Sequence, residues 1–456
     1  MLAEGRHFGG NPFFTPEIIK TLNEILQHPW WTRIWVVQET VVATRATVLL
    51  GSVAASWTIF AQAAKNYERH SSSCCPAFNM RHTPIHTRDI LDIKRSRAVW
   101  KCQSLTTLLP LVWQFRVRQS TDPRDKIYAL LGLATRWGSC PAFEPDYSKQ
   151  WTEVYKKFIL HMIAAFRSVD ILLAVSPSCA GSWIPDWTRD TAAKHPDRLH
   201  QLENYNASKT AAAQVELHGD VLTTAAIRLS EIVEISPELP LGDTNRATAV
   251  QWYDPDVRKW FLPSKKQGYE NDGAGNSASQ DSSWRLLCAD SITKKSGSKV
   301  ARRAEVEDQE LFDSWWLSIK ALARTANASL YGFNDDLGRF DHAVRTATGG
   351  RRFFRTWDGL YGLGPSDMEL GDEVWIPLSS RTPFVARKMA SNTDSLGDCG
   401  NGCLRLRGHK FVKIDDSHLI SPVTIHFLLG DCFYQGFMDG EAIDTLFSYR
   451  QILYLA

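Results

Sequence analysis

The segment DPRDK, residues 122–126, combines residue types that could bind a charged ligand. Arg124 and Lys126 are two closely spaced cations, and such a pair could clamp a phosphate or a nucleotide. The same segment also fits the start of a helix, with Asp122 as N-cap, Pro123 at the first helical position and Asp125 in the first turn. We favour the helix start, with Arg124 and Lys126 forming salt bridges between elements.

A second motif, SWIPDW at residues 182–187, contains the elements of an aromatic docking site in Trp183, Pro185, Asp186 and Trp187. Two tryptophans can also anchor a loop through burial, with the aspartate accepting backbone or indole hydrogen bonds. We favour this structural role and expect the loop to join a helical part to a β-rich part.

Two glycine-aspartate pairs indicate turns. Gly371 and Asp372 precede the apolar run VWIPL, which indicates a turn into a buried strand. Met438, Asp439 and Gly440 are expected to form a turn that closes the last hairpin.

The cysteines do not form a metal-binding pattern. Nine cysteines are scattered along the chain, and Cys399 and Cys403 form one of only two close groups, the other being Cys74 and Cys75. A structural zinc site needs a second pair of ligands at short spacing, which is missing. We therefore expect no metal site and reduced thiols in a reducing compartment.

Familiar enzyme motifs are also missing from the sequence. Its 13 histidines form no H-E-x-x-H group, and neither a G-x-S-x-G elbow nor a glycine-rich phosphate loop is present. The sequence therefore predicts no hydrolase, kinase or dehydrogenase of these kinds, and no bound cofactor.

Composition predicts a folded protein without a strong electrostatic field. The 456 residues are 44% hydrophobic, and 52 Lys and Arg offset 50 Asp and Glu. This balance favours neither a nucleic-acid nor a membrane partner. The first residues show no secretion signal and no stretch of about 18 apolar residues occurs, so we expect a cytoplasmic protein.

The first two hundred residues mainly predict helices. Thr15, Pro16 and Glu17 are typical of a helix start. The further elements expected are a helix at 31–39, a short buried strand at 46–51, a helix from Ser56 to Tyr67, a loop at 70–86, a helix from Trp151 to Ile163 and a buried strand at 171–176.

From residue 205 the apolar period changes toward two, which indicates strands. A hairpin is expected at Gly219–Asp220, and a β-rich domain is expected over residues 205–263 and 306–456, with a helix in LFDSWWLSIKALAR. Residues 264–305 are polar and glycine-rich, which predicts a disordered insertion. The fold class expected is therefore α+β, with a helical N-terminal region followed by a small barrel or sandwich.

The block HPWWTRIWVVQETVVATRATVLLG, residues 28–51, resembles the end of the fungal heterokaryon-incompatibility (HET) domain, whose strongest mark is W-x-x-R-x-W-V-x-Q-E. TDPRDKIYALLGLA with PDYSK, then SWIPDWT, and then GLGP, GDEVWIP, TPFVARK and GFMDGEAI follow in the order of long HET-family proteins. The motif residues are Arg33, Trp35, Gln38, Glu39, Asp122, Arg124, Asp125, Lys126, Trp183, Asp186, Trp187, Gly371, Asp372 and Gly440. The chain is therefore identified as resembling this family over residues 28–443.

The family pattern begins with two blocks, like LSY-x-W-G and LWIDA-x-CINQ, that are not present in this sequence. The resemblance thus implies a chain truncated at its N-terminus. Its expected parts are the end of a HET domain at 1–69, a helical region at 70–204, and the β-rich domain with its insertion.

The HET domain is remotely similar to TIR domains, some of which cleave NAD with a glutamate four residues after a tryptophan. Trp35 and Glu39 stand at that spacing here. On a helix the indole would lie beside the carboxylate, shield it from water and raise its pKa. The alternative for Glu39 is a surface carboxylate that pairs with Arg33 or Arg45. The resemblance also implies that the helical N-terminal region is the remnant of a TIR-like α/β unit.

Three functions remain open at this point. By resemblance, HET proteins act in vegetative incompatibility, where non-self recognition between fused hyphae leads to regulated cell death. The chain would act as a signalling module that binds other incompatibility proteins or itself. It could instead hydrolyse NAD through Glu39, with NAD as substrate only, or be an inactive truncated family member.

Overall fold

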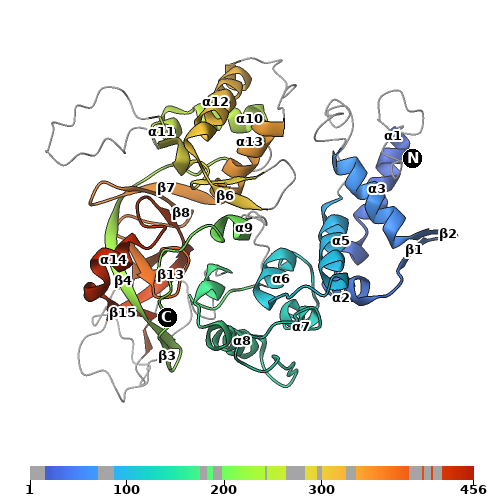
Figure 1. The fold of residues 1–456 in the computed structure, drawn as a ribbon, viewed down its shortest axis with the longest axis horizontal. Coiled ribbons are helices and arrows are strands. Elements are labelled where there is room, and N and C mark those ends of the chain that lie inside the picture. Colours follow the sequence, from blue (N-terminus) through green and yellow to red (C-terminus); the bar gives the residue numbers. More distant parts are fainter. Residues whose placement is uncertain are drawn as a thin grey trace. The chain divides into compact units, whose positions relative to one another are not determined.

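The computed structural model describes residues 16–69, 87–174, 182–187, 198–241, 244–262, 283–294, 300–324, 335–389, 403–404, 412–413 and 424–456. The chain divides into two compact units (Figure 1). Unit 1 comprises Met1–Trp151 with Tyr331–Asp335, and unit 2 comprises Thr152–Leu330 with Asp336–Ala456. The boundary near residue 151 differs from those expected near residues 70 and 205.

Unit 1 is mainly helical in its described residues. Its elements are α1 (Pro16–Leu26), η2 (Pro29–Thr32), α2 (Trp35–Val42), β1 (Thr47–Leu50), β2 (Val53–Ser56), α3 (Trp57–Arg69), α5 (Arg88–Lys101), α6 (Leu108–Phe115) and α7 (Asp125–Leu131). The apolar face of α2 packs against α5 and α7. These contacts explain why residues 16–69 and 87–131 form one unit.

The helix expected at residues 31–39 is interrupted at Arg33. The backbone of Arg33 is extended, and Ile34 donates its N–H to the carbonyl of Gln119 over 2.9 Å. Gln119 in turn donates to the carbonyl of Thr32 over 2.6 Å. This pairing with a distant segment breaks the sequence block into η2 and α2.

The strand expected at residues 46–51 is present as β1, but it is not buried. Leu49 is 71% exposed and Leu50 is 52% exposed. In the described residues β1 pairs with β2 alone, and this two-stranded sheet pairs with no third strand. The local sequence predicted the strand correctly and its burial wrongly.

A buried arginine closes the end of α2. The side chain of Arg97, on α5, donates to the carbonyls of Val41 and Thr44 over 3.2 Å each. The last carbonyls of a helix lack partners within the helix, and a cation there also interacts favourably with the negative end of the helix dipole. Arg97 therefore joins α5 to α2 through the backbone.

Unit 2 combines helices with a large sheet. Its helical elements are α8 (Trp151–Phe166), which begins at the boundary residue, η4 (Asp170–Ala174), α9 (Arg198–Leu202), α10 (Arg246–Tyr253), α11 (Pro255–Arg258), η5 (Ser283–Leu286), η6 (Val306–Asp308), α12 (Gln309–Arg324), α13 (Asp335–Thr348), α14 (Glu441–Leu446) and η8 (Phe447–Tyr449). The 3₁₀ helix η4 replaces most of the strand expected at 171–176. The long helices α8 and α12 confirm their predictions.

The strands of unit 2 are β3 (Val215–His218), β4 (Val221–Ile235), β5 (Ser291–Thr293), β6 (Ala301–Arg303), β7 (Arg351–Thr356), β8 (Tyr361–Pro365), β9 (Glu373–Pro377), β10 (Phe384–Lys388), β11 (Cys403–Leu404), β12 (Val412–Lys413), β13 (Ile425–Asp431), β14 (Phe433–Tyr434) and β15 (Gln451–Leu455). The β3–β4 hairpin turns at Gly219 and Asp220 as predicted. The mixed α+β class is confirmed.

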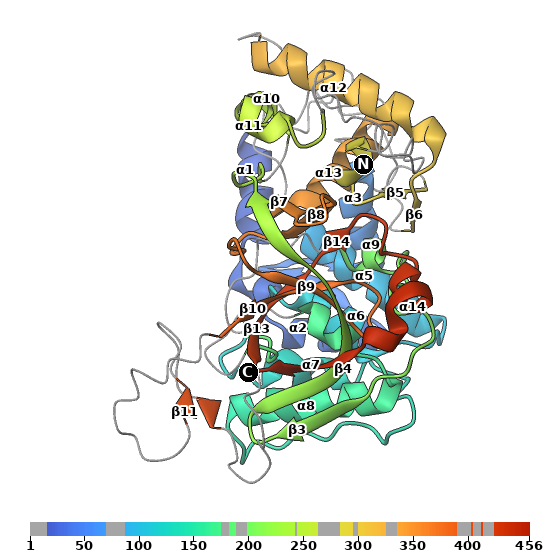
Figure 2. The ribbon, with the colours of Figure 1, turned by 90° about the vertical axis from the view of Figure 1, so that its left-hand side faces the viewer.

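Strand β4 organises the sheet because it pairs with different neighbours along its length. Its first part pairs with β15, its middle with β9 and its end with β7. Figure 2 shows it as one long curved strand. Register shifts next to Leu229 and Val233 let it bend between these neighbours.

The pairing around β4 closes on itself. β15 pairs with β13 in parallel, and β13, β10 and β9 follow in antiparallel order until β9 returns to β4. The five strands therefore form a closed ring, which corresponds to the barrel rather than the sandwich of the prediction. β7, β8 and β14 continue from the end of β4.

One buried carboxylate links four strands of this ring. Glu373 on β9 is fully buried, and its Oε1 lies 2.6 Å from Arg228 Nε on β4 and 2.7 Å from Lys388 Nζ on β10. Its Oε2 lies 3.0 Å from His426 Nε2 on β13 and accepts from Trp375 Nε1 over 3.1 Å. We name these five side chains the Glu373 cluster.

The electrostatics of this cluster favour an ionised Glu373. Burial by itself raises the pKa of the carboxyl, but hydrogen bonds from His426, Lys388 and Arg228 outweigh burial and lower the pKa to about 2. Because the ordinary value is 4.5, folding favours the charged form. The associated stability is complete above about pH 4.5 and is lost as the pH falls toward 2.

We predict that Glu373 makes the stability of unit 2 sensitive to acid. Between about pH 5 and pH 2 the wild type should lose about 3 kcal/mol that a Glu373→Gln variant does not lose, at about 1.4 kcal/mol per pKa unit. Urea unfolding across this pH range measures the difference. The matched control is Glu310→Gln, an exposed carboxylate on α12. Parallel pH profiles for wild type and Glu373→Gln would contradict the prediction.

Candidate functional site

A single aspartate joins three of the sequence blocks in unit 1. Trp35 Nε1, on α2, donates to Asp125 Oδ2 over 2.9 Å, and Tyr147 Oη donates to Asp125 Oδ1 over 2.6 Å. Each carboxylate oxygen thus holds one aromatic donor. We name Trp35, Asp125 and Tyr147 the Asp125 junction.

The chemistry of Tyr147 suits this role. Burial and the hydrogen bond to Asp125 both raise the pKa of its phenol. The hydroxyl therefore keeps its proton near neutral pH and remains a donor. The sequence included Tyr147 in the PDYSK block, but its contact with Asp125 could not be read from their spacing.

Arg124, the residue before Asp125, also contacts the loop that contains Tyr147. Its guanidinium pairs with Asp122, with an Nη2–Oδ2 distance of 2.6 Å, and Nη1 donates to the carbonyls of Tyr147 and Lys149 over 2.6 and 2.7 Å. The hydrogen bond from Arg124 lowers the pKa of Asp122. Arg124 thus holds the PDYSK loop, and its ion pair with Asp122 is local, whereas a salt bridge between elements was expected.

The helix start is displaced from its predicted position. Asp122 Oδ1 accepts the backbone N–H of Arg124 over 2.9 Å, and α7 begins at Asp125 rather than directly after Asp122. The aspartate therefore caps the turn before the helix.

Lys126 is buried and serves the backbone. Its Nζ donates to the carbonyl of Arg116 over 2.9 Å and to that of Arg118. These carbonyls follow α6, where backbone acceptors lack helical partners. Since Arg124 and Lys126 are both engaged by the protein, they do not form the phosphate clamp that the spacing allowed.

The positions of Gln38 and Arg33 are also explained by packing and backbone pairing. A Cβ added at Gly132, after α7, would lie 2.8 Å from Gln38 Nε2, so glycine allows the close approach of α2 to this turn. Arg33 joins Gln119 through its backbone, and its side chain is exposed.

Glu39 lies on the exposed side of α2. The expected shielding by Trp35 is wrong, because the carboxylate is open to water while the indole N–H is directed to Asp125. Among the described residues no ion pair links Glu39 to Arg33 or Arg45, so the alternative pairing is not formed either. Nothing in these contacts positions Glu39 for catalysis.

The SWIPDW motif is a buried anchor in unit 2. Trp183 donates its Nε1–H to the carbonyl of Asp220 over 2.9 Å, in the turn between β3 and β4. Trp187 packs edge-on against Tyr155 and Phe158 of α8, at centroid distances of 4.8 and 5.9 Å. Asp186 is also buried. The anchoring role is confirmed, and the buried indoles are not available for docking.

The two predicted glycine turns have different outcomes. Gly371 has a φ of +91° and leads into the fully buried β9, as predicted, while Asp372 accepts from Arg387 Nε over 2.8 Å. Gly440 has a φ of +97° and precedes helix α14. The turn at Met438–Gly440 therefore starts a helix, and the prediction that it closes a hairpin is wrong.

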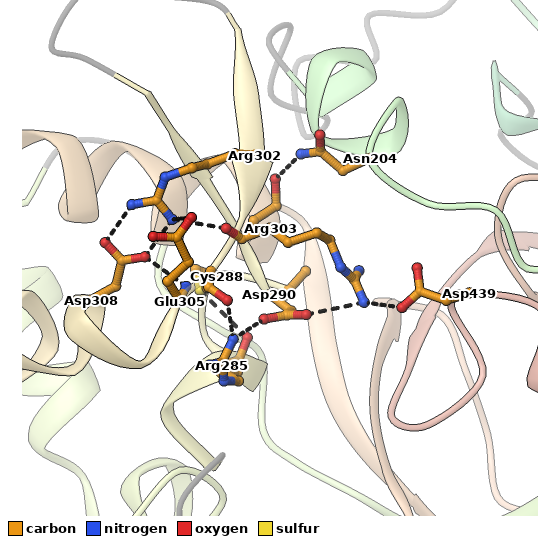
Figure 3. Close-up of polar contacts among 12 residues, drawn as sticks. Asn204, Arg285, Cys288, Asp290, Arg302, Arg303, Glu305, Asp308 and Asp439 are labelled. Atoms are coloured by element: carbon orange, nitrogen blue, oxygen red, sulfur yellow. Dashed lines mark hydrogen bonds and ion pairs between the residues drawn. The ribbon is translucent and has the colours of Figure 1, made fainter.

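A charged cluster that the sequence did not indicate surrounds β5 and β6 (Figure 3). Asp290 lies 2.6 Å from Arg285 and 3.1 Å from Arg303, and Arg303 lies 2.6 Å from Asp439. Burial raises the pKa of Asp290, while the two arginines oppose this rise. Asp290 and Ala289 both have left-handed backbone conformations, with φ of +53° and +48°, which non-glycine residues rarely adopt.

This cluster corrects the prediction of a disordered insertion at 264–305. Residues 263–282 and 295–299 lie outside the described residues, but η5, β5 and β6 are folded and Trp284 and Ile292 are buried. Burial also raises the pKa of the Cys288 thiol to about 12, which makes a nucleophilic role unfavourable.

Two cavities in the described part of unit 2 have volumes of about 10 Å³ each, which is room for one water molecule, and no motif residue lines either of them. No group of three His, Cys, Asp or Glu side chains in the described part of the chain has a metal-binding arrangement. Cys399 lies outside the described residues. Within the same limits, no helix is both long and apolar enough to cross a bilayer.

The fold and the site together define a mixed α+β protein whose motif residues mostly hold elements together. Comparison with protein-family models, curated proteins and solved structures finds no match to this chain.

We predict that the Asp125 junction stabilises unit 1. Asp125→Ala leaves two donors without their acceptor, so the free energy of unfolding should fall by about 1–2 kcal/mol. A double-mutant cycle with Trp35→Phe should give a coupling energy of about 0.5–1.5 kcal/mol, measured by urea unfolding. The control Glu39→Gln, on the exposed side of α2, should stay within about 0.5 kcal/mol of wild type. Additive effects of Trp35→Phe and Asp125→Ala would show that the junction is not energetically coupled.

Proposed function

We propose that this chain is a HET-domain signalling protein that acts in the cytoplasm during vegetative incompatibility. In this proposal it binds other incompatibility proteins or a second copy of itself, and its output is regulated cell death. The observation that carries the proposal is the Asp125 junction. Blocks that resemble the family at residues 28–51, 121–134 and 145–149 meet there through side-chain hydrogen bonds.

A structural role for the motif residues favours signalling over catalysis. Trp35, Arg124 and Lys126 are engaged in contacts that hold α2, α6 and α7 and the loop before α8. Glu39 is exposed without a positioned partner in the described residues. A glycosidic bond is cleaved only when the ligand and the carboxylate are held in a reactive geometry.

We also propose that unit 1 is the remnant of a TIR-like domain, on the sequence resemblance alone. The described strands of unit 1, β1 and β2, are antiparallel, apart from one isolated parallel bridge between Arg33 and Gln119. A TIR-like unit is built around a parallel sheet, so these strands add no support to the relationship.

Expression in a filamentous fungus tests the proposed function. Inducible wild-type protein should arrest growth while cellular NAD stays constant. Glu39→Gln should arrest growth as well as wild type, because the exposed carboxylate has no role in signalling. Asp125→Ala should reduce the arrest, because it weakens unit 1. Growth, NAD content and protein abundance are measured in the same cultures.

Other outcomes separate the remaining functions. A fall in NAD that Glu39→Gln abolishes would replace the proposal with NAD hydrolysis. Wild-type protein that accumulates without any growth arrest would favour an inactive family member.

A further inference from the structure

Two arginines meet at one tyrosine on the helical side of unit 2. Tyr253 ends α10, Arg258 ends α11 and Arg324 ends α12, and these helices lie together in Figures 1 and 2. Arg324 Nη2 donates to Tyr253 Oη. The guanidinium carbons of Arg258 and Arg324 lie 5.1 and 5.2 Å from the centroid of the tyrosine ring.

The local structure orients the tyrosine ring and defines the turn beside it. Trp316 of α12 stacks on Tyr253 at a centroid distance of 6.0 Å, which orients the ring. The turn between α10 and α11 is capped by Asp254, whose carboxylate accepts the backbone N–H of Asp256 over 2.8 Å. The two arginines reach this ring from different helices, Arg258 from α11 and Arg324 from α12.

Within the described residues, neither Arg258 nor Arg324 forms an ion pair with a carboxylate, although Asp256 lies 4.0 Å from Lys259 nearby. Both arginines lie in the last turn of a helix, where the helix dipole offsets only part of their charge. Hydrogen bonds from Arg324 and Arg258 lower the pKa of the Tyr253 phenol, as two converging cations should. Lys320 lies one helical turn before Arg324 and so adds a third cation on the same face of α12.

We propose that Tyr253, Arg258 and Arg324 form a binding site for a phosphate group. Arg324 donates to the phenolic oxygen and the guanidinium carbon of Arg258 lies 5.1 Å from the centroid of the same ring, so an anion beside this ring would face both cations. A phosphate monoester carries a charge near −2 at neutral pH, which offsets the two arginines. Arginine presents a planar set of donors that suits phosphate better than a single ammonium group does.

The source of the phosphate is either a phosphorylated protein segment or a free nucleotide. Both present the same dianion to the arginines, and the described residues around the site do not distinguish them. This inference stands independently of the proposed signalling function.

Calorimetric titration tests the site with two probes, AMP and a short phosphoserine peptide, at constant ionic strength. Wild-type protein should bind at least one probe with one-to-one stoichiometry. Arg258→Gln or Arg324→Gln should weaken binding about tenfold or more, and the double variant should abolish it. The matched control is Arg352→Gln, a partly exposed arginine of β7 that pairs with Glu238 at 3.7 Å. Its affinity should equal that of wild type.

The pH dependence adds a second readout. A monoester gains its second charge near pH 6, so affinity should rise between about pH 5 and pH 7.5. Tighter binding of the phosphopeptide identifies a protein source, and tighter binding of AMP identifies a free nucleotide. The proposal is overturned if neither probe binds, or if the double variant binds as wild type does. In both cases the arginines would serve only to pack against Tyr253.

Discussion

The buried carboxylate of Glu373 links four of the five strands that form the closed ring of unit 2. This carboxylate forms ion pairs or hydrogen bonds with side chains of β4, β10 and β13 as well as with Trp375 of its own strand β9. Burying a carboxylate is costly unless strong donors replace the lost water, and here four donors do so. Because those donors come from separate strands, the carboxylate of Glu373 is fully paired only when β4, β9, β10 and β13 are together in the ring. Strand β4 makes this closure sterically feasible, since its two register shifts let a single strand contact β15, β9 and β7 in turn.

Unit 1 uses polar side chains in a related way. Asp125 joins two aromatic donors, Arg97 closes α2 and Lys126 closes the segment after α6. The contact of Trp35 with Asp125 spans 90 residues and that of Arg97 with Val41 spans 56, whereas Lys126 reaches back only 10 residues to Arg116. The motif residues that carry the family resemblance are thus explained in large part by the assembly of the unit. This explanation is consistent with a protein that acts through binding, and it assigns no chemistry to Glu39.

Two kinds of arginine contact can be distinguished among the described residues. In the first kind, the guanidinium donates to backbone carbonyls, as in Arg97 and Arg124, or forms an ion pair with a carboxylate, as in Arg228 with Glu373. Arg258 and Arg324 instead converge on a neutral phenol. An arginine paired with a carboxylate contributes to the fold, whereas two arginines without a described carboxylate partner could bind an anion, as proposed above. This electrostatic difference, rather than any sequence motif, distinguishes the proposed phosphate site from the structural ion pairs.

Local sequence was sufficient for the elements whose determinants lie within a few residues. The apolar periodicity of α8 and α12 predicted both helices, and Gly219–Asp220 predicted the β3–β4 turn. The burial of Trp183 and Trp187 also agreed with the expected anchoring role. Tertiary structure alone decided the break at Arg33, the exposure of β1, the folding of β5 and β6, the partners of Asp125 and the exposure of Glu39. The reason is physical: helix periodicity and turn geometry are set by neighbouring residues, whereas burial and hydrogen-bond partners are set by segments that may lie a hundred residues away.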